Sequence, residues 1–373
     1  ALERRDRLRA MARFQQLTSP VAAKSVEDTA FYRYGTLLSR NEVGADPGEF
    51  ALSAGRFHAA CAERLARYPG AMLATATHDH KRGEDLRARL AVLSEMPQRW
   101  TERVTRWSAL AAGLKDKAGP DATDEYMLYQ MLVGAWPLDL GPEPSAALEQ
   151  LRERLAGWQR KAVREAKRRS GWIEPNQPYE EACDGFLQRL LDGASAPELL
   201  RDIWSFVQDI AAAGALNGLA QTALRLATPG VPDLYQGCEW WDFSLVDPDN
   251  RRPVDFAARR AALEQVGGDE LEHWRDGRVK QRLIAAVLDW RRRHPPVFSH
   301  GRHVPLEIEG RAARHLLAFA RLIDHGAALL MVVPRFPTGL LRQPDSLRID
   351  PQCWEDTCLR LPDALSARHF RRL

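Results

Sequence analysis

A dense group of charged residues follows a short apolar run between residues 74 and 90 of this 373-residue chain. The segment reads ATATHDHKRGEDLRARL, and its small and β-branched residues stop abruptly at His78 and Asp79. A carboxylate directly after a buried strand, with Lys81 and Arg82 close behind it, can be held ionised by its neighbours. Such a carboxylate can bind sugar hydroxyls or stabilise a positively charged transition state. The alternative interpretation is a surface loop with ion pairs.

A second polar segment, KSVEDTAFYRY at residues 24–34, combines charges with aromatic rings. Planar rings stack on the apolar faces of sugars, and paired carboxylates and guanidinium groups bind hydroxyls. This composition therefore suits a carbohydrate ligand. The alternative is the start of a helix, with Asp28 or Thr29 as its cap.

A third polar region extends from residue 235 to residue 252. Adjacent tryptophans lie in a polar loop and are equally consistent with a plain hydrophobic core. The DPDN motif at 247–250 lacks the spacing, the Gly and the terminal Glu of a calcium-binding loop, which excludes that site. A basic helix face around Lys161 and Lys167 is interpreted as solvated or, alternatively, as functional.

Familiar catalytic and cofactor motifs are absent from the sequence. It contains no GxxxxGK[ST], no GxGxxG after a strand, no HExxH and no GxSxG. The ten His are dispersed, and the five Cys are scattered and odd in number, which favours reduced thiols in a cytosol. We therefore expect no metal, no cofactor and a cytoplasmic location.

The composition is that of an ordinary soluble protein, with 45% hydrophobic and 28% charged residues. Lys and Arg number 53 against 50 Asp and Glu, which gives a net charge of +3. Neither a nucleic acid nor a membrane is expected as a partner, because the chain has no strong field and no apolar stretch of ~20 residues. The basic amino terminus has no apolar signal region.

The elements around the opening cluster predict one step of a parallel sheet. Ser53 is a candidate N-cap for a helix that ends near Tyr68, and a turn leads to a buried strand at 71–77. In parallel folds, sites are built at the carboxyl ends of strands. A helix over 1–16 ends at Pro20, and VAAKSV at 21–26 is a candidate short strand.

Helical periodicity runs almost unbroken from about residue 90 to 225, and another strand is predicted at 231–235. From His303 onward the pattern is β, including a short run at 347–349. We predict four parts: a barrel segment at 1–90, a helical insertion at 91–222, a barrel-closing segment at 223–295 and a β domain at 296–373.

Several motifs together resemble the maltooligosyl trehalose synthases, intramolecular transglycosylases of the α-amylase clan. They occur in order between residues 14 and 362 and read KSVEDTAFYRY, NEVGADPGEF, ATHDHKRGEDLRARLAVLSEMPQRW, DEYMLYQMLVGAWP, GVPDLYQGCEWWDFSLVDPDNRRPVDF and HLLAFAR. The resemblance implies an α/β fold: the carboxyl-terminal part of a (β/α)8 barrel, with an all-helical insertion and a carboxyl-terminal antiparallel β domain. It assigns 21–26, 71–77 and 231–235 as barrel strands six, seven and eight.

The resemblance also implies the site residues. Asp79 matches the carboxylate of a His-Asp pair that stabilises an oxocarbenium-like transition state. The residues implied in binding the maltooligosaccharide substrate are His78, Lys81, Arg82, Lys24, Glu27, Asp28, Tyr32, Arg33, Tyr235, Gln236, Asp249 and Arg251. The family has Gly where Ser25 stands and Thr where His80 stands, which puts the detailed binding geometry in doubt.

The nucleophile and the acid/base of the family have no match in the chain. We therefore expect a carboxyl-terminal fragment that is inactive alone, lacks the amino-terminal half of the barrel and self-associates through exposed apolar surface. The complete enzyme would form maltooligosyl trehalose, in trehalose biosynthesis. The alternatives are an α-glucan hydrolase of the same clan, a glucan-binding fragment without catalysis and a helical interaction protein.

Overall fold

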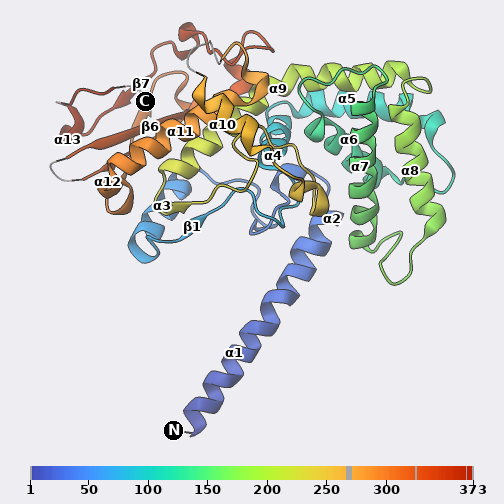
Figure 1. Cartoon of the computed structure of the whole chain (residues 1–373), viewed down its shortest axis with the longest axis horizontal. Helices are drawn as coiled ribbons and strands as arrows, with labels where there is room; N and C mark the ends of the chain where they lie inside the picture. Colours follow the sequence, from blue (N-terminus) through green and yellow to red (C-terminus); the bar gives the residue numbers. More distant parts are fainter. Residues whose placement is uncertain (1, 266–270, 324–325, 367, 372–373) are drawn as a thin grey trace.

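The computed structural model describes residues 2–265, 271–323, 326–366 and 368–371, and combines many helices with small sheets (Figure 1). The elements of the first part are α1 (Leu2–Ala22), η1 (Ala23–Ala30), α2 (Phe31–Arg33), η2 (Leu38–Arg40), α3 (Ala54–Arg67), β1 (Met72–Leu73), α4 (Glu84–Ala91) and η3 (Val92–Glu95). The helical part continues with α5 (Pro97–Leu110), η4 (Ala112–Leu114), α6 (Ala122–Ala135), α7 (Ala146–Ala166), α8 (Gln177–Leu191) and α9 (Pro197–Ala227).

The rest of the chain returns to the body and ends in β structure. Its first elements are β2 (Val231–Pro232), η5 (Asp247–Arg251), α10 (Phe256–Glu264), η6 (Trp274–Asp276), α11 (Arg278–Arg293) and α12 (Pro295–Ser299). The last elements are β3 (Arg302–Pro305), β4 (Glu307–Glu309), η7 (Ala313–His315), β5 (Leu316–Leu322), β6 (Ala328–Pro334), η8 (Pro337–Gly339), η9 (Pro351–Trp354), β7 (Cys358–Arg360) and α13 (Asp363–Ser366).

Two short strands far apart in the sequence form a parallel pair. Met72 of β1 is in register with Val231 of β2, and the N–H of Val231 donates to the carbonyl of Ala71 at 2.9 Å. The predicted strands at 71–77 and 231–235 are therefore present, but each is only two residues long. The expectation that 71–77 is buried throughout is wrong, because the Met72 side chain is 71% exposed.

The expected strand at 21–26 is wrong. The helix α1 continues through Pro20 to Ala22, and the π-helix η1 carries the chain on to Ala30. A strand needs a hydrogen-bonded neighbour, and no described strand lies beside this segment, so the helix-forming alanines decide the local structure. Figure 1 shows α1 projecting from the body.

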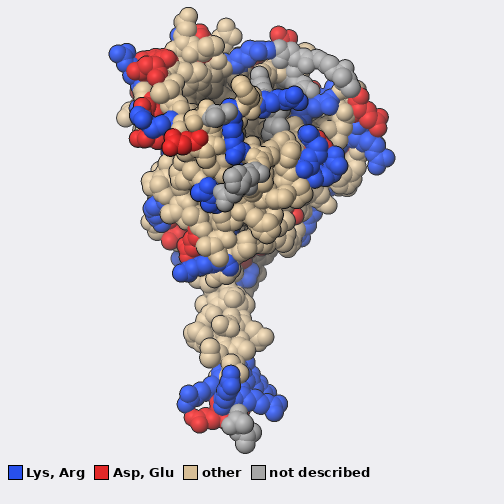
Figure 2. All heavy atoms as spheres, turned by 90° about the vertical axis from the view of Figure 1, so that its left-hand side faces the viewer, with Lys and Arg blue, Asp and Glu red and all other residues tan. Residues whose placement is uncertain are grey.

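The projecting helix carries an apolar stripe and a basic end. Large apolar side chains on α1 that are more than half exposed are Leu8, Met11, Phe14, Leu17 and Val21. Figure 2 shows Lys and Arg side chains gathered at the far end of the projection, with uncharged surface along its length. The first residue of the helix predicted at 1–16 lies outside the described residues.

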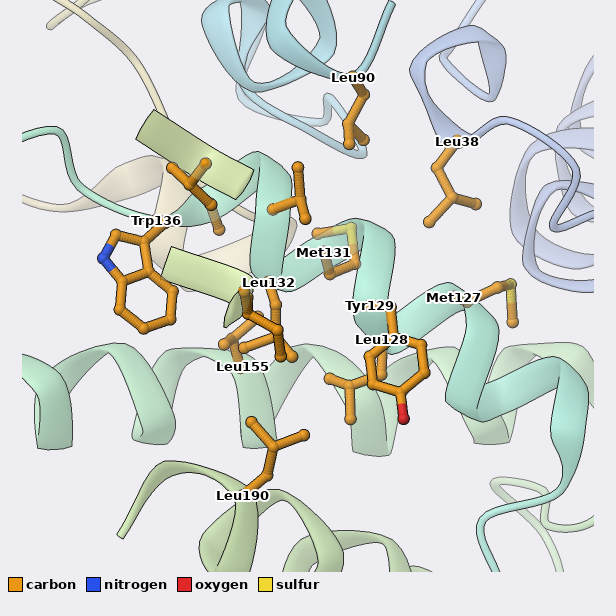
Figure 3. Packing of buried hydrophobic residues seen from close by; sticks show 14 of the residues in the cluster. Leu38, Leu90, Met127, Leu128, Tyr129, Met131, Leu132, Trp136, Leu155 and Leu190 are labelled. Carbon is orange, nitrogen blue, oxygen red and sulfur yellow. The ribbon is translucent and has the colours of Figure 1, made fainter. Parts of the chain in front are cut away.

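The helical part is built from helices, as the periodicity predicted, and its hydrophobic core also includes residues of the first part, such as Leu38 and Leu90. Every residue of α6 from Met127 to Ala135 is buried, as in a helix surrounded by others. Leu132 of α6 lies close to Leu155 of α7, and Trp136 packs at the end of the same cluster (Figure 3). Asp121 caps α6 by accepting the N–H groups of Thr123 and Asp124 at 3.0 Å.

The carboxyl-terminal β structure is antiparallel, as predicted. The strand order of the larger sheet is β3-β5-β6, and β4 pairs with β7. The run predicted at 347–349 is not a strand. The division into four domains stays a prediction.

A cluster of buried charges joins the parts together. Lys280 of α11 is fully buried, and its Nζ lies 2.6 Å from Glu84 Oε1 and 2.6 Å from Asp85 Oδ2. Arg225 Nη1 of α9 lies 2.7 Å from Glu84 Oε2. Burial by itself would raise the pKa of Glu84, but the two cations outweigh it and hold that pKa below its ordinary value. Three helices are thus fixed by one ion network.

No helix in the described ranges is both long and apolar enough to cross a membrane.

Replacing Lys280 with Met should lower the free energy of unfolding by ~3–5 kcal/mol, because it leaves two buried carboxylates without their shared cation. Urea denaturation followed by circular dichroism measures the change. The control is Lys117→Met, at an exposed lysine, which should move the midpoint little. Equal midpoints for the two variants would show that the network does not hold the helices together.

Candidate active site

The loop after β1 is held by a buried histidine. The N–H of Asp79 donates to Thr77 Oγ1 at 3.2 Å, and the N–H of Thr77 donates to His80 Nδ1 at 3.3 Å. Since Nδ1 accepts, the hydrogen lies on Nε2, which donates to Ser244 Oγ at 2.9 Å. Burial lowers the pKa of His80 and keeps the ring neutral. The histidine that departs from the family pattern therefore supports the loop.

A carboxylate from another loop holds the next two residues. Glu42 accepts the N–H groups of Lys81 and Arg82 at 2.8 and 3.1 Å. Lys81 Nζ donates to Asp28 Oδ1 at 2.7 Å, and Arg82 Nη1 donates to the carbonyl of Asn41 at 2.9 Å. Both side chains are buried. In this structure the two cations predicted to bind sugar are engaged by the protein.

The segment 24–34 packs against this loop, and its predicted site residues contact different parts of the protein. Lys24 pairs with Asp28, and Glu27 accepts the N–H of Gly44 at 3.2 Å. Burial by itself would raise the pKa of Asp28, but Lys24 and Lys81 together hold it below its ordinary value. Asp28 is therefore an ionised bridge between the two predicted clusters.

Two other residues of this segment face the protein. The Tyr32 hydroxyl is buried without a hydrogen-bond partner among the described residues, and burial raises its pKa above the ordinary range. Arg33 Nε donates to the carbonyl of Ala166, the last residue of α7, at 2.6 Å.

The third polar region also meets the opening loop. Arg251 Nε donates to the carbonyl of His78 at 3.1 Å, and Asn250 Nδ2 donates to the carbonyl of His80 at 3.2 Å. Asp249 accepts from Arg154 Nε at 2.8 Å and from the N–H of Leu245 at 2.6 Å. The structure thus brings together three clusters that the sequence analysis selected separately.

A polar cavity of about 490 Å³ opens beside these contacts. Three predicted residues, Tyr235, Gln236 and Asp249, line it with Trp241, Asp242 and Asn250. The His80 ring meets Tyr235 edge-on, with centroids 6.0 Å apart. An aromatic surface together with carboxylate and amide groups suits a ligand rich in hydroxyls.

His78 and Asp79 are exposed at the open side of the loop. Neither lines this cavity. Within the described ranges, the Asp79 carboxylate forms no hydrogen bond or ion pair. The pKa of Lys24 is raised chiefly by Asp28, with further contributions from Glu165 and Asp79, so the lysine lies within electrostatic reach of this carboxylate.

The end of α7 reaches two of the clusters. Lys161 forms an ion pair with Asp247, and Lys167 Nζ lies 3.1 Å from Thr29 Oγ1. The helical part therefore borders the same region as the two loops. Across the described residues, no group of three or more His, Cys, Asp or Glu has the arrangement of a metal site.

Sequence reasoning missed several residues that build this region. Glu42 and Asn41 lie outside the three polar clusters, while Ser244 and Asn250 lie in the third polar region but were not among the predicted site residues. Each acts through a contact distant in sequence. No spacing signal marks such contacts.

Comparisons with known proteins find similarity to the maltooligosyl trehalose synthases over most of this chain and over less than half of each relative. No protein-family profile matches it. A maltooligosyl trehalose synthase of Mycobacterium tuberculosis is 41% identical over 351 residues, which are 94% of this chain and 41% of the relative. The solved maltooligosyltrehalose synthase of Arthrobacter ramosus is 40% identical with a TM-score of 0.74, over 89% of this chain and 40% of that one. A Sulfolobus tokodaii structure of that name is 31% identical, also with a TM-score of 0.74, over 88% and 42%.

The bridging carboxylates predict a pH dependence. The pKa values of Asp28 and Asp249 are lower in the folded chain than their ordinary values. Each therefore contributes stability above the unfolded pKa of ~4, and this contribution is lost as the pH falls through the folded pKa. Asp28→Asn should flatten the fall in unfolding free energy below pH ~5, measured by urea titrations at several pH values.

The matched control for this experiment is Asp6→Asn, at an exposed aspartate of α1. It should reproduce the pH profile of the unsubstituted chain. The ion-pair bridge would be refuted if Asp28→Asn also kept that profile.

Proposed function

We propose that this chain forms part of an intramolecular transglycosylase, because it is a homologue of the maltooligosyl trehalose synthases along 94% of its length. The enzyme would convert the reducing-end α-1,4 linkage of a maltooligosaccharide into an α,α-1,1 linkage. One observation carries this proposal: three polar clusters meet beyond the carboxyl end of the parallel pair β1–β2, beside the exposed Asp79.

The chain spans about 41% of the length of the curated relatives that it matches. We propose that this part supplies Asp79 and a share of the sugar contacts. The nucleophile and the general acid/base would come from the remaining length of the enzyme. The exposed apolar stripe of α1 supports this assignment, because it offers a surface for further packing.

The proposed reaction retains the anomeric configuration. The nucleophile attacks the anomeric carbon of the penultimate glucose, while the general acid protonates the oxygen of the leaving reducing-end glucose. Asp79 stabilises the positive charge that develops on the ring. The released glucose turns in its subsite, and its anomeric hydroxyl attacks the glycosyl-enzyme while giving its proton to the acid/base.

Water must be kept from the glycosyl-enzyme, because water would give hydrolysis instead. The end of α7, the segment 24–34 and the loop 247–252 border one region and are the proposed enclosure. The cavity beside Tyr235 is the proposed place for hydroxyl groups of the glucan.

A glucan-binding role without catalysis is the second candidate. The polar cavity favours it, and so does the presence of one matched catalytic carboxylate where the family uses three. This candidate predicts that the complete protein binds maltopentaose without changing it.

The test is Asp79→Asn in the complete enzyme, with maltopentaose as substrate. The substitution removes one preorganised electrostatic partner and should lower turnover by at least ~100-fold. The measurement combines reducing-end loss with glucose release. The control is Glu181→Gln, which makes the same carboxylate-to-amide change at an exposed position of α8.

The products distinguish a transglycosylase from a hydrolase, and the turnover of the variant tests the role of Asp79. A transglycosylase consumes reducing ends without releasing glucose, because the 1,1 linkage joins both anomeric carbons. Glucose released in step with new reducing ends would instead identify a hydrolase. Near-normal turnover of Asp79→Asn would remove Asp79 from the catalytic role.

A further inference from the structure

A second cavity, of about 610 Å³, lies between α3, β1, α9 and the strands β5 and β6. Its volume is in the range of small-molecule sites. None of the predicted sugar-site residues lines it. The larger apolar residues of its wall are Phe57, Met72, Leu73, Leu224, Leu317, Val333 and Phe336.

One face of α9 supplies part of the wall, including the polar residues Asn217, Gln221 and Arg225. Asn217, Gln221, Leu224, Arg225 and Thr228 all line the cavity. They recur every three or four residues, so they lie along one side of the helix.

Arg225 has one edge of its guanidinium group in use and one edge free. Only 4% of the residue is exposed, and Nη1 contacts Glu84 Oε2 at 2.7 Å and also Thr75. In contrast, Nε and Nη2 are buried without a hydrogen-bond partner among the described residues. These two atoms form the edge that binds a carboxylate or phosphate through two parallel hydrogen bonds.

The side-chain amide of a neighbouring residue also lacks a hydrogen-bond partner among the described residues. Gln221 lies one turn before Arg225 on α9, and its Nε2 is also buried without a partner within the described ranges. Buried donors without acceptors are costly and uncommon in folded proteins. Two residues that line the same cavity thus carry three buried donors without an acceptor, and this indicates a missing acceptor.

The other charges around the cavity favour an anion. Arg64 and Arg335 line it as well, while Glu95 is the only acidic residue among the described lining residues. The Glu95 carboxylate is occupied, since Oε2 accepts the N–H of Thr338 at 3.0 Å and its hydroxyl at 2.7 Å. Glu84 lies behind Arg225 and shares its charge with Lys280.

We propose that this cavity binds a small amphiphilic anion. Its carboxylate or phosphate group accepts from Nε and Nη2 of Arg225 and from Nε2 of Gln221, and its apolar part lies against Phe57, Leu73 and Leu224. The inference does not rest on the proposed glucan chemistry, because α-glucans are uncharged and the two sites share no predicted residue.

Isothermal titration of the 373-residue chain tests this site with four probes: octanoate, octyl phosphate, inorganic phosphate and 1-octanol. Octanoate or octyl phosphate should bind at one saturable site per chain and raise the melting temperature. The stronger of the two identifies the preferred anionic group. Because 1-octanol lacks the charge, it should bind at least about tenfold more weakly, and inorganic phosphate, which lacks the apolar part, should also bind more weakly.

The variants locate the site. Gln221→Met removes one donor without touching the ion network and should weaken octanoate binding by about tenfold. Arg225→Lys keeps the charge but loses the two-donor edge and should abolish saturable binding. The matched control is Gln159→Met, because the Gln159 amide is also buried without a partner among the described residues but lines a cavity of only about 10 Å³.

Saturable binding that is unchanged in Gln221→Met would overturn the proposal, and so would equal binding of 1-octanol. Absence of saturable binding by either alkyl anion would overturn it as well. If Arg225→Lys does not fold, Gln221→Met against Gln159→Met decides the question.

Discussion

A buried ion network of Lys280, Glu84, Asp85 and Arg225 fixes three helices of the structure relative to one another. Charges removed from water are tolerated only when they are closely paired, so the helices that carry them have little freedom to shift. One of these helices, α4, begins directly after the loop 78–83, and another, α9, leads into β2. The network therefore sets the positions of both segments that border the candidate active site.

Close backbone contacts add to this constraint. The N–H of Gly83 donates to the carbonyl of Ser244 at 2.8 Å. A Cβ atom at Gly83 would lie 2.5 Å from the carbonyl oxygen of Asp242, so only glycine permits this approach. The polar loops are thus held against each other by contacts that exclude a larger residue, and the exposed Asp79 is carried on a supported backbone.

Arg225 connects the apolar cavity with the ion network behind the candidate active site. One of its nitrogens belongs to the ion network that supports the candidate active site, while its other two nitrogens have no partner among the described residues and the residue lines the apolar cavity. The two cavities have different chemistry: one is polar and bordered by the predicted sugar-binding residues, and the other is apolar with an excess of arginine. An anion in the second cavity would contact the same side chain that positions Glu84.

Local sequence signals predicted the local structure well. Ser53 caps α3 by accepting the N–H of Arg56, and the long helical stretch and the late antiparallel strands lie where periodicity placed them. The strand expected at 21–26 failed because strand formation depends on a neighbour rather than on the segment itself. The roles of Glu42, Ser244 and Lys280 were not predicted, because each depends on a partner far away in the sequence. These partners are residues 81, 80 and 84, respectively. Residue types selected the three clusters, and the resemblance to a known family assigned roles to their residues, but only the fold showed that they meet.

The loops beyond β1 and β2 are proposed to form part of a sugar site. Nuclear magnetic resonance of the 15N-labelled chain, titrated with maltopentaose, tests this proposal most directly. Saturable shifts should be concentrated at the amides of residues 78–82 and 235–251. Shifts confined to other parts of the chain, or their absence at millimolar maltopentaose, would contradict the proposal.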